Sequence, residues 1–334
     1  MKYCNDECNE NHREQHEEEC RKRKTELRDR DLFTLPDSSY LGECPICCLP
    51  QPIGERKCGY SACCSKYICN GCDHANQKRE IEAGLEHRCA FCREPLPRTQ
   101  KESFKRASKR IKNNDPVAMQ QMGQKRREEG DYESALKYLT KAAELGDADA
   151  HYNLSCMYHK GEGVEKDEKK HIYHLEEPAI GGHLVARHNL GIHEWNNGRY
   201  ERAVKHSIIA ANLGYNDSLK VLMKLYAEGH ATKQDYANAM RAYQATVAAT
   251  KSSQRDEAER YQELYHNFVA AGSRRKMLAC FSLQHRRFVF NHLPTSHESG
   301  TSKHLSEGVP VRPPSKSKIH LSKPRQNPAT PLHL

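Results

Sequence analysis

Small and apolar positions recur with helical spacing between residues 115 and about 270, and their arrangement repeats along the chain. Glycines close successive units at spacings of 36 and 32 residues, at Gly146, Gly182 and Gly214. A small residue stands four positions after each glycine and a leucine four positions later, in the pairs Ala150 and Leu154, Ala186 and Leu190, and Ser218 and Leu222. Glycine ends a helix at little conformational cost, and positions four apart share one helix face. The pattern predicts stacked antiparallel helix pairs, an all-α repeat solenoid.

Two stretches of this segment resemble Sel-like repeats, which are relatives of the tetratricopeptide repeat. Residues 158–167, YHKGEGVEKD, fit the family's Y-x-x-G-x-G-V-x-x-D loop, and residues 131–139, DYESALKYL, fit its second helix. The resemblance implies a solenoid that binds a protein or peptide on its concave surface and carries no chemistry. A generic helical bundle is the alternative. None of the histidines has H-E-x-x-H spacing, so we expect the solenoid surface to carry His171, His174, His183, His188, His193 and Glu194.

Composition divides the rest of the chain. Residues 21–40 are charged and then rich in turn residues, which predicts a linker, and residues 98–114 predict a basic helical connector. Residues 271–334 are rich in Pro, Ser, His, Lys and Arg, so we expect a basic disordered tail. From Ser273 onwards the tail holds eleven Lys/Arg and two Asp/Glu, and so it accounts for the net charge of +9.

The apolar pattern and the cysteines together indicate a compartment. No apolar run reaches the roughly 18 residues that span a membrane, so we expect no membrane partner. The first residues, MKYCNDE, lack the apolar stretch of a secretory signal. We therefore expect a cytoplasmic or nuclear protein, in which the dense cysteines form metal sites rather than disulfides.

Thirteen of the cysteines lie within the first 92 residues, most of them as close pairs. A gap of two residues lets both sulfurs of a C-x2-C pair reach one tetrahedral zinc at about 2.3 Å. The pairs between residues 41 and 97 are Cys44 and Cys47, Cys63 and Cys64, Cys69 and Cys72, and Cys89 and Cys92. Four pairs supply enough ligands for two structural Zn²⁺ ions.

This spacing resembles a RING-type finger, in which the ligand pairs interleave. The resemblance assigns Cys44, Cys47, Cys69 and Cys72 to the first zinc, and Cys64, Cys89 and Cys92 to the second. The family's fourth ligand of the second site falls on Lys66, whose ammonium cannot bind zinc. The substitutes are Cys63, which is the nearest in sequence, Cys58, His74 and His87. We expect Cys48 to be a small buried residue rather than a ligand.

The RING resemblance also implies partner contacts. The apolar residue between the first two cysteines, here Ile46, contacts a ubiquitin-conjugating enzyme in RING-type ligases. The cation after the last cysteine, here Arg93, contacts both that enzyme and ubiquitin. The alternative is that Ile46 belongs to the core and Arg93 is a solvated charge.

A second Cys/His cluster lies in residues 1–20. Cys4, Cys8, His16 and Cys20 resemble the second half of a MYND-type finger, a module that binds proteins. His16 and Cys20 stand one helical turn apart, so the four residues could share one zinc. A charged helix without metal is the alternative.

The sequence thus predicts a multidomain chain, with a small zinc-stabilised RING-like α+β finger followed by an all-α solenoid over residues 115–270 and a disordered tail. The function it favours is a RING-type ubiquitin ligase whose repeats recruit the substrate. A non-enzymatic zinc-finger and repeat scaffold is the main alternative. Nucleic-acid binding is the weakest hypothesis, because the finger lacks a basic helix and aromatic stacking positions.

Overall fold

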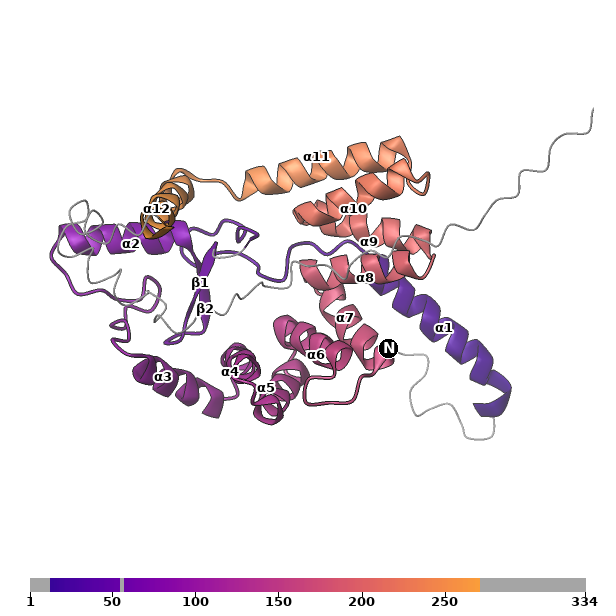
Figure 1. Ribbon diagram of the computed structural model, residues 1–334, viewed down its shortest axis with the longest axis horizontal. Helices are drawn as coiled ribbons and strands as arrows, with labels where there is room; N and C mark the ends of the chain where they lie inside the picture. The colour runs from indigo at the N-terminus through magenta and orange to yellow at the C-terminus, as the bar shows by residue number, and fades with distance from the viewer. Residues whose placement is uncertain (1–12, 55–56, 271–334) are drawn as a thin grey trace, which may run out of the picture.

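The computed structural model describes residues 13–54 and 57–270, which form a small cysteine-rich finger and a long array of helices (Figure 1). Helix α1 (Arg13–Phe33) precedes the finger, which contains β1 (Cys58–Ser61), β2 (Lys66–Cys69) and α2 (Asn70–Glu82). The two strands pair antiparallel, with Cys58 opposite Cys69 and Ser61 opposite Lys66. Helix α3 (Gln100–Lys112) then leads into the array, in agreement with the predicted helical connector.

The array consists of the next nine helices of the chain, which are joined mostly by short turns. They are α4 (Pro116–Glu128), α5 (Tyr132–Glu144), α6 (Ala148–Lys160), α7 (Glu168–Ile180), α8 (Leu184–Asn196), α9 (Tyr200–Asn212), α10 (Asn216–Ala227), α11 (Lys233–Ala249) and α12 (Ser253–Ala270). None of the helices in the described part of the chain is long and apolar enough to cross a membrane.

Aspartates begin four consecutive helices of the array. Asp115, Asp131, Asp147 and Asp167 each accept a hydrogen bond from a backbone N–H three residues on. These bonds satisfy donors that a helix start leaves unpaired, and each contributes about 1 kcal/mol. Because these caps recur at similar intervals, the helices of the array begin at regular positions along the chain.

The predicted core positions of the repeats are confirmed. The small residues Ala150, Ala186 and Ser218 are fully buried. The leucines Leu154, Leu190 and Leu222 are at most 1% exposed. Because small side chains separate the helices, antiparallel neighbours approach closely and the leucines fill the space between them.

The predicted linker over residues 21–40 differs from the structure, which places its first part in helix α1. Leu32 is buried in one apolar cluster with Leu175 and Ala179 of α7. Arg28 forms ion pairs of 2.9 Å with both Glu176 and Glu177. The helix was missed because few of its residues are apolar, and its partners lie about 150 positions away in the sequence.

Arg187 ties this helix to the array. Its guanidinium is fully buried and donates hydrogen bonds to the carbonyl oxygens of Leu32 and Ala179, at the ends of α1 and α7. Carbonyl oxygens at helix C-termini lack partners within the helix and carry partial negative charge, so a cation is favourable there.

The glycines that end the repeat units also allow a second segment to approach. Gly182 and Gly214 have φ of +84° and +95°, a conformation that favours glycine. A Cβ on Gly182 would lie 2.6 Å from the carbonyl oxygen of Ser38, and one on Gly214 would lie 2.7 Å from Ile53. The chain between α1 and the finger therefore runs along the turns of the array.

The array returns to the finger at its far end. Helix α12 lies beside α2, so finger and array close into a ring of contacts (Figure 1). Lys78 of α2 pairs with Glu257 of α12 at 2.8 Å, and the rings of His74 and Tyr261 lie 5.0 Å apart. The finger is thus held by both ends of the helical array.

Buried histidines should make the array sensitive to acid. The expectation of a surface position is wrong for His183, His188 and Glu194, which are all buried. The Nδ1 of His188 lies 2.9 Å from the Ser218 hydroxyl. Burial lowers the pKa of His188 to about 4, although Asp217 acts in the opposite direction. In the unfolded chain the His188 imidazole is protonated below about pH 6.5, whereas in the folded chain it stays neutral until about pH 4. The free energy of unfolding therefore falls as pH drops from about 6.5 toward 4.

We predict that His188 alone removes about 2 kcal/mol of unfolding free energy between pH 7 and pH 5. Urea denaturation of wild type and His188→Gln at the two pH values measures this contribution, since all other titrating groups are shared. The variant should show the smaller loss. An equal loss in both proteins contradicts the assignment.

Candidate metal centres in the finger

Two turns of the finger are built alike around a C-x2-C pair. In the first, Cys44 N–H donates to Leu49 O and Cys48 N–H donates to Cys44 O, both at 2.9 Å. In the second, Cys89 N–H donates to Glu94 O at 2.8 Å and Arg93 N–H donates to Cys89 O at 3.0 Å. The residue after each pair has positive φ, +54° at Cys48 and +63° at Arg93. Each turn therefore directs its two sulfurs to the same side.

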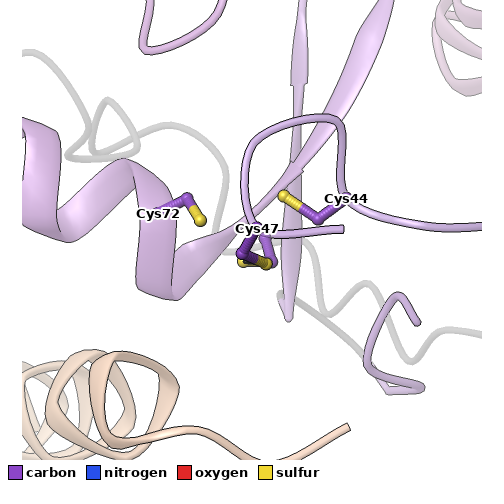
Figure 2. A group of neighbouring side chains, drawn as sticks. Cys44, Cys47 and Cys72 are labelled. Carbon is purple, nitrogen blue, oxygen red and sulfur yellow. Dashed lines mark hydrogen bonds between the residues drawn. The ribbon is translucent and has the colours of Figure 1, made fainter. Parts of the chain in front are cut away.

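The remaining two pairs come from the hairpin and the helix. Cys63 and Cys64 lie in the turn between β1 and β2, where Ser65 N–H donates to Ser61 O at 2.8 Å. Cys69 ends β2 and stands just before α2, and Cys72 lies in its first turn. Figure 2 shows Cys44 and Cys47 of the first turn near Cys72 of the helix.

The eight cysteines meet as two groups of four. Cys44, Cys47, Cys69 and Cys72 form one group, and Cys63, Cys64, Cys89 and Cys92 form the other. All the sulfurs of a group lie within 4.8 Å of one another. The groups interleave along the chain as the RING resemblance implies, and each could hold a metal ion.

The structure favours Cys63 as the fourth member of the second group. Its sulfur lies 3.3 Å from that of Cys92. Lys66 is exposed on β2, and the alternatives are engaged elsewhere: His87 lies 3.4 Å from Glu80, and His74 packs on Tyr261. Cys58 lies in β1, outside both groups. The expectation that Cys48 is buried is wrong, because Cys48 is exposed.

The sulfur spacing fits a tetrahedral ion. Four sulfurs about 2.3 Å from a central zinc stand about 3.8 Å from each other. The sulfurs of Cys47 and Cys69 lie 3.9 Å apart, as do those of Cys64 and Cys89. A disulfide would need about 2.05 Å, and all of these cysteines are free. The donor set therefore fits a thiophilic ion such as Zn²⁺.

Within each group, the pKa is raised for some of the cysteine thiols and lowered for another. Burial raises the pKa of Cys72, which also lies beside Cys69, and raises that of Cys64 to about 12. Burial also acts on Cys44 and Cys89, but hydrogen bonds from backbone N–H groups, first those of Cys47 and Cys92, outweigh it and lower both pKa values to about 7. Each turn thus provides one thiol that ionises readily, while Cys64 and Cys72 ionise less readily.

Helix α3, which leads into the array, and helix α12 at its far end both contact these cysteine loops. Arg255 of α12 is 9% exposed and donates to Pro50 O at 2.8 Å, and its Nη2 lies 3.4 Å from the sulfur of Cys47. Arg110 of α3 donates to Cys63 O at 3.2 Å. A Cβ on Gly71 would lie 2.8 Å from the Arg255 nitrogen, so this glycine permits the close approach of α12. These long-range contacts could not be predicted from the sequence.

The two predicted partner-contact residues have different surroundings. Ile46 is 41% exposed, so it is not a core residue. Arg93 is not simply a solvated charge. Its Nη2 lies 2.8 Å from the carboxylate of Glu80, which is fully buried, and its Nη1 donates to Asn76.

The N-terminal metal ligands fall partly outside the described residues. Cys4 and Cys8 lie there, while His16 and Cys20 belong to helix α1. The zinc site predicted for Cys4, Cys8, His16 and Cys20 stays a prediction. The tail over residues 271–334 also lies outside the described part of the chain.

Comparison with known proteins identifies the repeats. Residues 117–147 and 148–177 each match the family model of the Sel1 repeat. No curated protein matches the sequence. The prediction of Sel-like repeats is thus confirmed for the first part of the array.

Solved structures are similar to parts of this chain. One is c5321, a protective antigen of uropathogenic Escherichia coli strains displaying an SLR fold; the identity is 24%, the TM-score is 0.39, and the match covers 51% of this chain and 37% of that one. Another is a Sel1 repeat protein from Oxalobacter formigenes, with 22% identity, a TM-score of 0.39, and coverage of 58% and 86%. The chain spans little more than a third of the antigen's length.

The buried carboxylate of Glu80 yields a prediction about the finger. Arg93→Ala removes the cation paired with it and should lower the free energy of unfolding by about 1–3 kcal/mol. Arg79→Ala is the matched control, because Arg79 is 62% exposed and lies 3.9 Å from the same carboxylate. Its cost should stay below about 0.5 kcal/mol. Urea denaturation compares the two, and equal costs would rule out a structural role for Arg93.

The segments that match the repeat model belong to the array and are repeats of a protein-interaction type. The finger beside them has cysteines that could hold two metal ions. Residues 117–177 hold two Sel1 repeats, a motif that mediates contacts between proteins.

Proposed function

We propose that the finger binds two structural Zn²⁺ ions, one in each group of four cysteines. The supporting observation is the interleaving of two sulfur groups with tetrahedral spacing. Four thiolates around Zn²⁺ carry a net charge of −2, which Arg255 beside Cys47 offsets at the first site. With four protein ligands each, both sites are closed and stabilise the fold rather than catalyse a reaction.

We propose further that the protein is a RING-type ubiquitin ligase. The same interleaved arrangement carries this proposal, and Ile46 adds an exposed apolar side chain at the position that contacts the ubiquitin-conjugating enzyme in such ligases. The finger would hold the conjugating enzyme and its ubiquitin thioester, while the Sel1 repeats recruit the substrate protein. When Arg93 contacts ubiquitin, its guanidinium would either leave the Glu80 carboxylate or contact both partners at once.

The mechanism needs no nucleophile on this chain. A lysine of the bound substrate attacks the thioester, and the conjugating enzyme's cysteine leaves as a thiolate. The finger accelerates the reaction by holding both partners in a productive orientation. A protein that positions its partners in this way needs a rigid frame, which the contacts at both ends of the array supply.

An autoubiquitination assay with a panel of conjugating enzymes tests the ligase proposal. Ile46→Ala should reduce ubiquitin transfer about 10-fold, because an apolar contact of about 1.4 kcal/mol is lost. The matched control is Leu85→Ala, which truncates another exposed apolar residue of the finger, 57% exposed. Its activity should equal that of wild type.

The alternative is a scaffold that binds proteins without transferring ubiquitin. Wild type would then show no transfer with any conjugating enzyme, although the zinc ions and the repeats are intact. Transfer that is equal in wild type and Ile46→Ala would also contradict the proposed enzyme contact. Arg93→Ala is less suited to this assay, because it also leaves Glu80 without its partner.

A further inference from the structure

A cluster of metal-binding side chains lies in the second Sel1 repeat, far along the chain from the finger cysteines. His159 belongs to the last turn of α6, and Glu168 and His171 to the first turn of α7. The loop between α6 and α7 follows the end of α6 and precedes the start of α7, whereas Gly146 and Gly182 stand at the other ends of these two helices. The finger contacts the other edge, so this cluster is independent of it.

The three side chains converge on one point. One ligand atom from each of His159, Glu168 and His171 lies within 4.8 Å of the other two. The imidazole rings of His159 and His171 have centroids 4.7 Å apart, with an angle of 36° between the ring planes. His159 and Glu168 are exposed and His171 is half-buried, so an ion can reach them from solvent.

The backbone fixes the orientation of His171. Its Nδ1 lies 2.9 Å from the carbonyl oxygen of Ser155, a residue that is fully buried. A carbonyl only accepts, so Nδ1 carries the hydrogen and Nε2 is left with its lone pair. Metal-binding histidines are typically held by such a bond from the second ring nitrogen.

His193 of α8 orients the carboxylate in a similar way. The amide nitrogen of Asn197 lies 3.2 Å from Nε2 of His193, so Nε2 accepts and Nδ1 carries the hydrogen. This Nδ1 lies 3.3 Å from one carboxylate oxygen of Glu168. The other carboxylate oxygen is then free to bind an ion. His193 is a positioning residue rather than a ligand.

We propose that His159, Glu168 and His171 bind a Zn²⁺ ion on the edge of the repeat array. Two imidazoles and one carboxylate suit zinc, and three protein ligands leave one position of a tetrahedron open. Water or a side chain of a bound protein can occupy this position. The ion joins the start of α7 to the end of α6 and so closes the loop of residues 161–167 within the second repeat.

Calorimetric titration of the full chain with ZnCl₂ tests the site. Wild type should bind one more equivalent of zinc than either His171→Ala or Glu168→Gln. The Glu168 side chain is 61% exposed, so this second variant leaves the fold intact even if the loss of His171 disturbs packing. His193→Asn should keep the equivalent with about 10-fold weaker affinity.

The control is His230→Ala, which removes an exposed histidine from another turn of the array. It should bind as much zinc as wild type. All finger cysteines are unchanged in these proteins, so the difference between them reports this site whether or not the finger binds zinc. Equal zinc stoichiometry in wild type, His171→Ala and Glu168→Gln would overturn the proposal.

Discussion

The convergence of eight cysteine sulfurs on two points is the constraint on which the finger depends. Its buried cluster consists of those cysteines together with Ile68, Ala90 and Leu96. Two four-residue strands and one helix bury too little apolar surface to be stable alone. The two similar turns, the hairpin and the start of α2 each place a pair of sulfurs, and only together do they complete the groups. A structural metal is the usual means of stabilising so small a unit.

The helical array is linked to both cysteine groups by direct contacts. Arg110 and Arg255 contact the two cysteine groups from opposite ends of the array, so a change in the finger reaches both α3 and α12. Helix α1 and the segment after it fill the edge formed by the repeat turns, next to Gly182 and Gly214. The finger and the Sel1 repeats therefore form one continuous unit. Under the proposed function, this unit would hold the two partners at a fixed separation.

Local patterns in the sequence predicted much of this architecture. Pair spacing identified the eight finger cysteines, and the period of small residues and leucines identified the repeats, because both features are set by neighbours in the chain. Long-range contacts could not be predicted in this way. Helix α1 is held by Arg28 and Leu32 against a distant helix, and its polar sequence resembles a linker. The pairing of Arg93 with Glu80, and of Arg255 with the first cysteine turn, likewise depends on the folded chain.

The second metal site depends most on Cys63, which completes a group of four sulfurs where a histidine is expected from the RING pattern. X-ray absorption at the zinc edge, on the full chain carrying His171→Ala to remove the proposed repeat site and loaded with two equivalents of zinc, measures the ligand set of the finger directly. We expect four sulfur neighbours at about 2.3 Å for each ion and no nitrogen ligand. A nitrogen contribution at about 2.0 Å, retained in the Cys63→Ala variant, would contradict it.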